Sequence, residues 1–225
     1  MKLQHALIRP ACWAVFFLVS GTGAFAKAAP QLTFEKAFDT QRQPAATYFE
    51  AQYQSGGKTH TLKVWRDRNL RLRRETDGHV TTFVVNKADD DWTMTVLDSQ
   101  KKIETVVDRT NLYRVGNFTS WFGLAHGLNP PVGKYEVRAM TKPPTNKLDK
   151  TAPPCNWYSY TQNGNDTQVC WSNKLALPTA ILNDKGDVIW KITQVSTKPF
   201  DLAKTFRFKD EGYIRNDANA DISGD

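Results

Sequence analysis

"THTLKVWRDRNLRLRRETDGHVTTFVVN" (residues 59–86) alternates apolar and polar residues, and this alternation decides the fold class. Leu62 and Val64 have the same parity, so they share one face of an extended strand, whereas the polar residues between them face the other way. The next run alternates leucines with arginines. Asp77 and Gly78 form a two-residue hairpin signal, because both tolerate the left-handed backbone of a tight turn. The stretch therefore predicts antiparallel strands joined by tight turns.

The same period recurs along most of the chain. Alternating runs bounded by turn residues occur over residues 47–107 and again over 134–209. We therefore expect a mainly β protein with about ten or eleven short strands, arranged as an antiparallel sheet, a sandwich or a barrel. Residues 27–210 are predicted to form a single domain. Residues 211–225 are acidic and poor in apolar residues, and they are predicted to form a disordered tail.

One segment breaks the alternation. "NLYRVGNFTSWFGLAHGLNPP" (residues 111–131) places apolar residues every three or four positions, as a helix does, and Pro130 ends the pattern. A curved antiparallel sheet has a concave apolar face that either fills with side chains or takes a plug. We expect residues 111–128 to be a helical plug or lid on that face. Its glycines leave open whether it is one helix or two short turns, and whether it is plain core or borders a ligand cavity.

The N-terminal residues have the pattern of a secretory signal peptide. Basic residues precede a short apolar run at residues 11–19, and a small-x-small cleavage pattern ends at Ala26. We expect residues 1–26 to be removed and the protein to reside in the periplasm, with an uncleaved anchor as the alternative. Removing Lys2 and Arg9 from the 30 basic residues leaves 28 against 23 acidic ones, so the net charge becomes +5. That charge favours anionic surfaces without requiring nucleic acid.

Cleavage leaves two cysteines, Cys155 and Cys170. An even pair in an oxidising compartment predicts a disulfide, which would stabilise the fold by ~3 kcal/mol in the chain-entropy model. Two free buried thiols are the alternative. The spacing is not that of a redox-active or haem-attachment motif, and no histidine lies near either cysteine, so neither redox catalysis nor a metal site is predicted.

The C-terminal part of the chain carries a family resemblance. "VCWSNKLALPTAILNDKGDVIWKITQVSTKPFDLAKTFRF" (residues 169–208) resembles the end of the LolA/LolB-like outer-membrane lipoprotein-sorting superfamily, in which a strand ending at a tryptophan (here Trp171) leads into Leu-Pro, a further strand, a turn (here at Gly186) and a long strand. Residues 62–78 also resemble that group's early strands. The resemblance implies a half-open antiparallel barrel, a helical lid over its concave face, and binding of acyl chains or another apolar ligand. No ligand-contact residue of the family is carried over.

The residues expected to line an apolar cavity are inward-facing side chains of the early strands and the aromatic residues of the lid. On the sheet side they are Phe49, Leu62, Val64, Leu72, Phe83, Trp92, Met94 and Val96, and on the lid side Phe118, Trp121 and Phe122.

A second set of residues is basic. Arg66, Arg68, Arg71 and Arg73 are expected either to contact anionic lipid headgroups or an acidic partner, or to form a solvated edge that charge protects from aggregation.

No constellation of residues suggests an enzyme. The histidines of the mature chain, His60, His79 and His126, have no accompanying nucleophile motif, and we interpret them as packed or solvated side chains. No cofactor or metal is predicted. The sequence thus predicts a monomeric periplasmic protein that binds lipid or lipoprotein acyl chains and not nucleic acid. The alternative is a non-carrier envelope interaction or sensor protein, which meets an anionic membrane surface or an envelope protein through a basic outer face.

Overall fold

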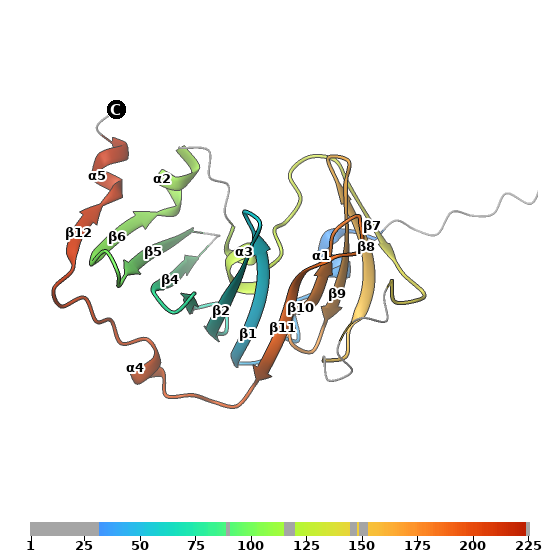
Figure 1. The fold of residues 1–225 in the computed structure, drawn as a ribbon, viewed down its shortest axis with the longest axis horizontal. Helices are drawn as coiled ribbons and strands as arrows, with labels where there is room; N and C mark the ends of the chain where they lie inside the picture. The colour runs from blue at the N-terminus through green and yellow to red at the C-terminus, as the bar shows by residue number, and fades with distance from the viewer. Residues whose placement is uncertain (1–31, 89–90, 115–119, 145–147, 149–152, 224–225) are drawn as a thin grey trace, which may run out of the picture. The chain divides into compact units, whose positions relative to one another are not determined.

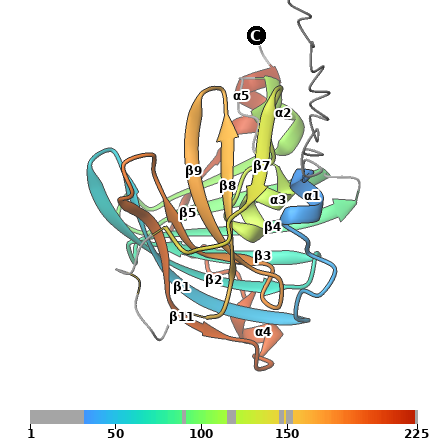
Figure 2. The same ribbon diagram turned by 90° about the vertical axis from the view of Figure 1, so that its right-hand side faces the viewer.

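The computed structural model describes residues 32–88, 91–114, 120–144, 148 and 153–223. Within them twelve strands form one sheet, in the order β12-β6-β5-β4-β3-β2-β1-β11-β10-β9-β8-β7. All neighbours run antiparallel except β12, which runs parallel to β6. The predicted fold class is confirmed: the protein is mainly β, with an open, curved sheet (Figure 1, Figure 2).

The strands are β1 (Ala46–Ser55), β2 (Lys58–Asp67), β3 (Arg71–Thr76), β4 (Val80–Ala88), β5 (Asp91–Asp98), β6 (Ile103–Asp108), β7 (Tyr135–Ala139), β8 (Asn156–Gln162), β9 (Asn165–Ser172), β10 (Leu177–Leu182), β11 (Val188–Ser196) and β12 (Ile214–Asp217). The helices are α1 (Phe34–Ala37), α2 (Arg109–Arg114), α3 (Trp121–His126), α4 (Leu202–Thr205) and α5 (Ala218–Ser223). None of the helices in the described ranges is long and apolar enough to span a bilayer.

Alternation along the strands gives the sheet an inner and an outer face. Phe49 pairs with Val64 across β1 and β2, and both side chains are buried on the inner face. Trp65, which has the opposite parity, lies on the outer face. The predicted hairpin turn between β3 and β4 is confirmed, because Asp77 and Gly78 both have positive φ, at 50° and 72°. The alternation therefore predicted these strands, and the Asp77-Gly78 pair predicted this turn.

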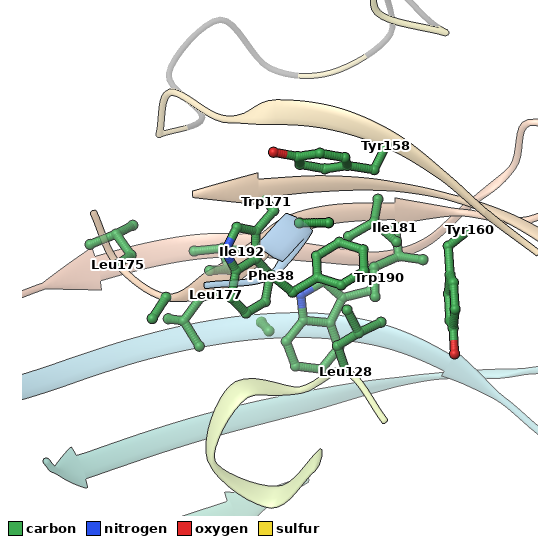
Figure 3. Close-up of a cluster of buried hydrophobic side chains, with 14 of the residues drawn as sticks. Phe38, Leu128, Tyr158, Tyr160, Trp171, Leu175, Leu177, Ile181, Trp190 and Ile192 are labelled. Carbon is green, nitrogen blue, oxygen red and sulfur yellow. The ribbon is translucent and has the colours of Figure 1, made fainter. Parts of the chain in front are cut away.

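The inner face of β1, β2 and β7 to β11 is filled by its own side chains, and we call this region the packed side. Helix α1 supplies Phe34, and the C-cap residue that follows it is Phe38; their ring centroids lie 4.8 Å apart. Phe38 meets Tyr158 and Trp171 edge to face, each at 5.4 Å between centroids (Figure 3). Each large apolar side chain buried here contributes roughly 1.5–3 kcal/mol to folding. The packed side therefore holds the largest hydrophobic cluster of the described residues.

The segment predicted as a helical plug folds as two short helices, one of the two forms that the glycines left open. Helices α2 and α3 lie within residues 109–126, and residues 115–119 fall outside the described ranges. Helix α3 packs on the inner face of β3 to β5, where Trp121 and Leu124 join Leu72 and Trp92 in a second hydrophobic cluster. We call the inner face of β3 to β6 the hollow side, because a cavity remains between it and α3.

The prediction of a disordered tail after residue 210 is wrong. β12 pairs with β6, and α5 follows it, with the Asn219 side chain accepting a hydrogen bond of 2.8 Å from the backbone of Asp108. The four residues of β12 are all exposed, so they show no apolar alternation that the sequence could have revealed. Backbone pairing to the edge strand, not burial, orders this segment. The signal-peptide prediction concerns residues 1–26, which lie outside the described ranges.

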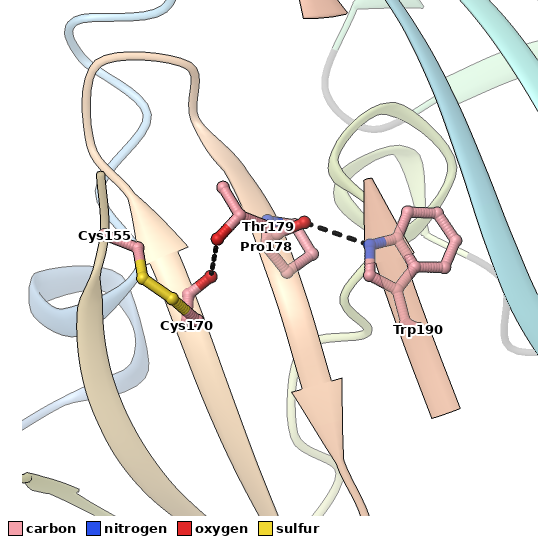
Figure 4. Close-up of a disulfide and its surroundings, with 5 residues drawn as sticks. All are labelled: Cys155, Cys170, Pro178, Thr179 and Trp190. Atoms are coloured by element: carbon pink, nitrogen blue, oxygen red, sulfur yellow. Dashed lines mark hydrogen bonds between the residues drawn. A yellow bond between two sulfur atoms is a disulfide. The ribbon is translucent and has the colours of Figure 1, made fainter. Parts of the chain in front are cut away.

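Cys155 and Cys170 are joined as predicted (Figure 4). Cys155 precedes β8 and Cys170 lies on β9, with 5.3 Å between their Cα atoms. Cys170 is buried on the outer face together with Ala180 and Leu182 of β10. The disulfide therefore ties two neighbouring strands behind the packed side.

Candidate functional site

A cavity of about 510 Å³ lies between the inner face of the sheet and α3. Its lining residues come from strands β1, β3, β5, β6 and β11, from helices α2 and α3, and from the segment after α3. They are Tyr53, Arg74, Met94, Val96, Val107, Leu112, Gly123, Leu124, Gly127, Asn129 and Trp190. Most of these side chains are apolar, and the volume falls within the ~300–1,000 Å³ of typical ligand pockets. The hollow side therefore offers a space under α3 whose walls combine apolar side chains with the polar groups of Tyr53, Arg74 and Asn129.

Two glycines shape the wall that α3 presents. Ser120 caps the helix by accepting a hydrogen bond of 3.0 Å from the Gly123 amide, and Gly127 ends it in a left-handed conformation with φ of 70°. A Cβ at Gly123 would lie 2.1 Å from the Asn129 side-chain oxygen, and one at Gly127 would lie 3.2 Å from the Trp190 ring. A side chain at Gly123 would displace the end of the Asn129 side chain. At Gly127 the positive φ and the close Trp190 ring together favour glycine.

Arg66 holds the end of α3 against the packed side. This side chain, 0% exposed, donates hydrogen bonds of 2.9 Å to the carbonyl oxygens of Ala125 and Leu175. Its Nη1 atom also lies 2.7 Å from His126 Nδ1, which is 2.7 Å from the Ala176 carbonyl oxygen. Arg66 was predicted to contact anionic partners, and that prediction is wrong because the residue is enclosed by the core. Its guanidinium is balanced by carbonyl dipoles.

Burial changes the pKa values of both members of this contact. Desolvation lowers the pKa of Arg66 from 12.5 to about 10, so the guanidinium stays charged at neutral pH. Desolvation, together with the positive charge of Arg66, lowers the pKa of His126 from 6.5 to about 3, against the opposing effect of the Ala176 carbonyl. His126 is therefore neutral in the folded protein near neutral pH. It is a packed residue, as the sequence suggested.

Three predicted lining residues belong instead to the packed side. Phe49, Leu62 and Val64 are at most 2% exposed and lie within the large cluster that α1 completes. Phe122 also joins this cluster, with its ring stacked 6.1 Å from that of Trp171. These side chains face inward as predicted, but they do not border the cavity. The aromatic residues of α1 occupy the space in front of them.

The remaining lining predictions divide between the hollow side and the outer face. Met94 and Val96 border the cavity. Trp121 of α3 packs against Leu72 and Trp92 of the sheet. These three side chains are buried beside the cavity but do not line it. Phe118 lies outside the described residues.

Phe83 was predicted to line the cavity, and that prediction is wrong. It pairs with Arg73 on the outer face, and its ring lies 5.2 Å from that of Phe208. The apolar run Phe83–Val85 does not alternate, so the sequence alone could not say which parity faces inward.

The other predicted basic residues lie on the outer face, and two of them contact the chain's own C-terminal segment. Arg71 is bonded to Asp67 at 3.1 Å and lies over the Phe206 ring at 4.5 Å. Arg73 contacts Glu75 and donates a hydrogen bond of 3.0 Å to the Thr205 carbonyl oxygen. They therefore dock residues 205–206 onto the sheet.

Arg68 is exposed in the turn between β2 and β3 and has a positive φ of 50°. It makes no ion pair within the described part of the chain. It is the one predicted anion-contact residue whose side chain remains accessible and uncommitted there.

Sequence reasoning missed most of the cavity's walls. Tyr53 and Arg74 have the same parity as the buried residues Phe49 and Leu72 on their strands, and that parity is a signal that could have identified them. Trp190 reaches the cavity from β11, which neighbours β1 only in the folded sheet. Gly123 and Asn129 meet through the turn after α3, a contact that no local pattern of residues indicates.

Comparison with known proteins yields distant similarities only. No protein-family model matches the chain, and no curated protein sequence matches it. Among solved structures, a crystal structure of MucB matches with a TM-score of 0.38 and 14% identity, over 77% of this chain and 60% of that one. MucB in complex with MucA(peri) matches with a TM-score of 0.34 and 14% identity, over 72% and 53%. PNGF-II matches with a TM-score of 0.34 and 12% identity, over 79% and 33%.

The chain thus spans less than two thirds of each of these structures. At such identities and TM-scores the likeness concerns the fold alone. The resemblance to the LolA/LolB-like superfamily likewise stays a prediction beyond the mainly β fold.

Proposed function

We propose that this protein is a periplasmic binding protein that holds the apolar chain of a lipid or lipoprotein between its sheet and α3. One observation carries the proposal: a cavity of about 510 Å³ with apolar side chains from β5, β6, β11, α2 and α3 in its walls is left open beneath α3, while the packed side is filled. Surfaces of this kind are favourable sites for apolar ligands, because burial removes about 25 cal/mol of unfavourable hydration free energy per Å².

The location of the protein in the periplasm is part of the proposal. Its support is the leader pattern of residues 1–26 and the disulfide between Cys155 and Cys170, which is typical of an oxidising compartment. Binding needs no catalytic group, and we propose no reaction. Holding an apolar chain requires only that the cavity exclude water around it.

A cavity-filling substitution tests the proposal directly. Val96→Phe places a larger side chain into the cavity, whereas the matched Val85→Phe puts the same side chain on the outer face of the adjacent strand, where Val85 is 49% exposed. Binding of the neutral fluorescent probe N-phenylnaphthylamine is measured for both variants. We expect Val96→Phe to weaken probe binding at least tenfold and Val85→Phe to leave it unchanged. Equal binding by both would overturn the proposal.

Native mass spectrometry supplies a second test. Protein purified from the periplasm without detergent should carry additional mass that organic extraction removes, and Val96→Phe should carry less of it. A chain that is always free of such mass, and that binds no apolar probe, would contradict a carrier role.

A second function has separate support on the outer face. A pocket of about 900 Å³ lies there between β2 to β5 and the C-terminal segment, and Lys204, Arg207 and Lys209 are among its lining residues. These exposed side chains form no ion pair with any other described residue. Such a surface would attract an anionic membrane. Flotation with vesicles that contain phosphatidylglycerol, weakened by salt and by Arg207→Glu with Lys209→Glu but not by Val96→Phe, would favour this function.

A further inference from the structure

One cationic side chain lines the otherwise mostly apolar cavity. Arg74 lies on β3 with the parity of Leu72, and it pairs with Val64 of β2 and Thr82 of β4 on the inner face. Its neighbours along the cavity wall include Met94 and Val96 of β5, Val107 of β6 and Leu124 of α3. A guanidinium therefore projects into a space that is otherwise suited to hydrocarbon.

Unlike Arg66, Arg71 and Arg73, Arg74 has no side-chain hydrogen-bond acceptor among the described residues. Arg71 contacts Asp67, Arg73 contacts Glu75, and Arg66 is surrounded by carbonyl oxygens. Within the part of the chain that the structure describes, no carboxylate pairs with the Arg74 side chain and no group accepts a hydrogen bond from it; its electrostatic interaction is with Tyr53. None of the described residues supplies a counter-charge to this guanidinium.

An unpaired charge in such surroundings has a cost in free energy. Burial lowers the pKa of Arg74, with Tyr53 acting in the opposite direction, which shows that the surroundings disfavour the charged form. Arginine nevertheless remains protonated in proteins at neutral pH. A ligand that brings an anion to this point would offset that cost, whereas a purely hydrocarbon ligand would not.

We propose, building on the binding function above, that the cavity takes a single-chain amphiphile with one anionic head group, which pairs with Arg74 while the chain lies against Met94, Val96, Val107 and Leu112. The guanidinium presents parallel N–H donors that match both carboxylate and phosphate oxygens. The shared chemistry is therefore a carboxylate or phosphate at the end of an apolar chain. The volume of about 510 Å³ suits one chain rather than a multi-chain lipid in full.

Displacement of N-phenylnaphthylamine by four matched ligands tests the inference with the wild-type protein. Dodecanoate and dodecyl phosphate carry the anion, whereas dodecanol and methyl dodecanoate have a chain of the same length without it. We expect one or both anions to bind at least tenfold more tightly than the neutral pair, because a charge-assisted hydrogen bond in a desolvated site is worth about that much. Comparing the two anions shows which head group the site prefers.

Substitution of Arg74 assigns the preference to this side chain. Arg74→Gln should abolish the preference for anions while neutral ligands bind as before, and Arg74→Lys should keep part of it. Arg68→Gln, at an exposed arginine away from the cavity, serves as the control and should change nothing. Circular dichroism verifies that each variant is folded, and the wild-type comparison holds even where one is not.

The outcomes separate this inference from the function on which it rests. Equal affinity of the wild-type protein for anionic and neutral ligands would overturn the role of Arg74 and leave the carrier proposal standing. Failure of every ligand to displace the probe, or of the probe to bind, would overturn both. A preference for anions that survives Arg74→Gln would place the anion elsewhere and so contradict the inference.

Discussion

The packed and hollow sides of the inner face share one sheet and one alternating pattern, yet they are covered differently. On the packed side, α1 and the aromatic residues of β8 and β9 fill the space. The single side chain of Phe38 contacts three rings, those of Tyr158, Tyr160 and Trp171. On the hollow side, α3 presents Gly123 and Leu124, and a cavity of about 510 Å³ remains. Alternation therefore sets which face of the sheet is apolar, whereas the element lying on that face decides whether it is filled.

The difference also separates stability from binding. Interlocked aromatic rings leave little freedom for rearrangement, so changes on the packed side should mainly unfold the protein. Side chains around the cavity have fewer partners, so changes there should mainly alter ligand binding. Each of the following predictions tests one part of that division.

The largest effect is expected on the packed side. Trp171 is 0% exposed, and its ring packs against Phe38 and Phe122. Trp171→Ala should lower the free energy of unfolding by about 3–5 kcal/mol, through lost burial and the cavity left behind. Urea denaturation measures this change. A loss no greater than that of a cavity-lining variant would contradict the division between the two sides.

Removal of the disulfide should have the next largest effect. Cys155 and Cys170 are 15 residues apart in sequence, so Cys155→Ala with Cys170→Ala should lower the free energy of unfolding by ~3 kcal/mol in the chain-entropy model. Thermal unfolding with and without reductant checks the result. Reductant should destabilise the wild-type protein by a similar amount and leave the double variant unchanged. No effect of reductant on either protein would mean that the bond contributes nothing.

A pH effect is expected at His126, where α3 meets the packed side. Its folded-state pKa of about 3 is below the ordinary value of 6.5, so below pH 6.5 the unfolded chain binds a proton that the folded chain does not. The free energy of unfolding should therefore fall as pH drops from about 6.5 towards 3, by roughly 2 kcal/mol between pH 7 and pH 5.

His126→Gln isolates this contribution because it removes the titrating group. Urea denaturation of both proteins at the two pH values gives the comparison, and the variant should lose about 2 kcal/mol less than the wild type. Identical losses would show that His126 does not titrate as its buried position requires.

The smallest effect on stability is expected on the hollow side. Met94 is half-buried and borders the cavity, so Met94→Ala should lower the free energy of unfolding by only about 1 kcal/mol, because its side chain already lacks partners on one side. The same variant should change the affinity for N-phenylnaphthylamine measurably. A loss of stability comparable to that of Trp171→Ala would show that the cavity side is packed as tightly as the other.

Much of the fold was predictable from periodicity, and the exceptions have physical reasons. Strands with strict alternation, such as β1 and β2, show which residues face inward. Arg66 illustrates a misreading: its parity matches that of Leu62 and Val64, but its charge suggested an exposed surface. β12 was missed because none of its four residues is buried, so it left no apolar pattern. In both cases the residue type predicted one environment, and the position in the folded sheet imposed another.

By itself, the sequence determined the mainly β class, the tight turn at Asp77 and Gly78, the cysteine pair and the inward parity of most strands, because these depend on neighbours within a few residues. Only the tertiary structure decided which part of the inner face is filled, that Arg66 lies in the core, and that Arg74 and Trp190 meet at one cavity. Those outcomes depend on which strands become neighbours and on where α1 and α3 pack. Contacts between distant segments arise only once the sheet has formed, so no local pattern encodes them.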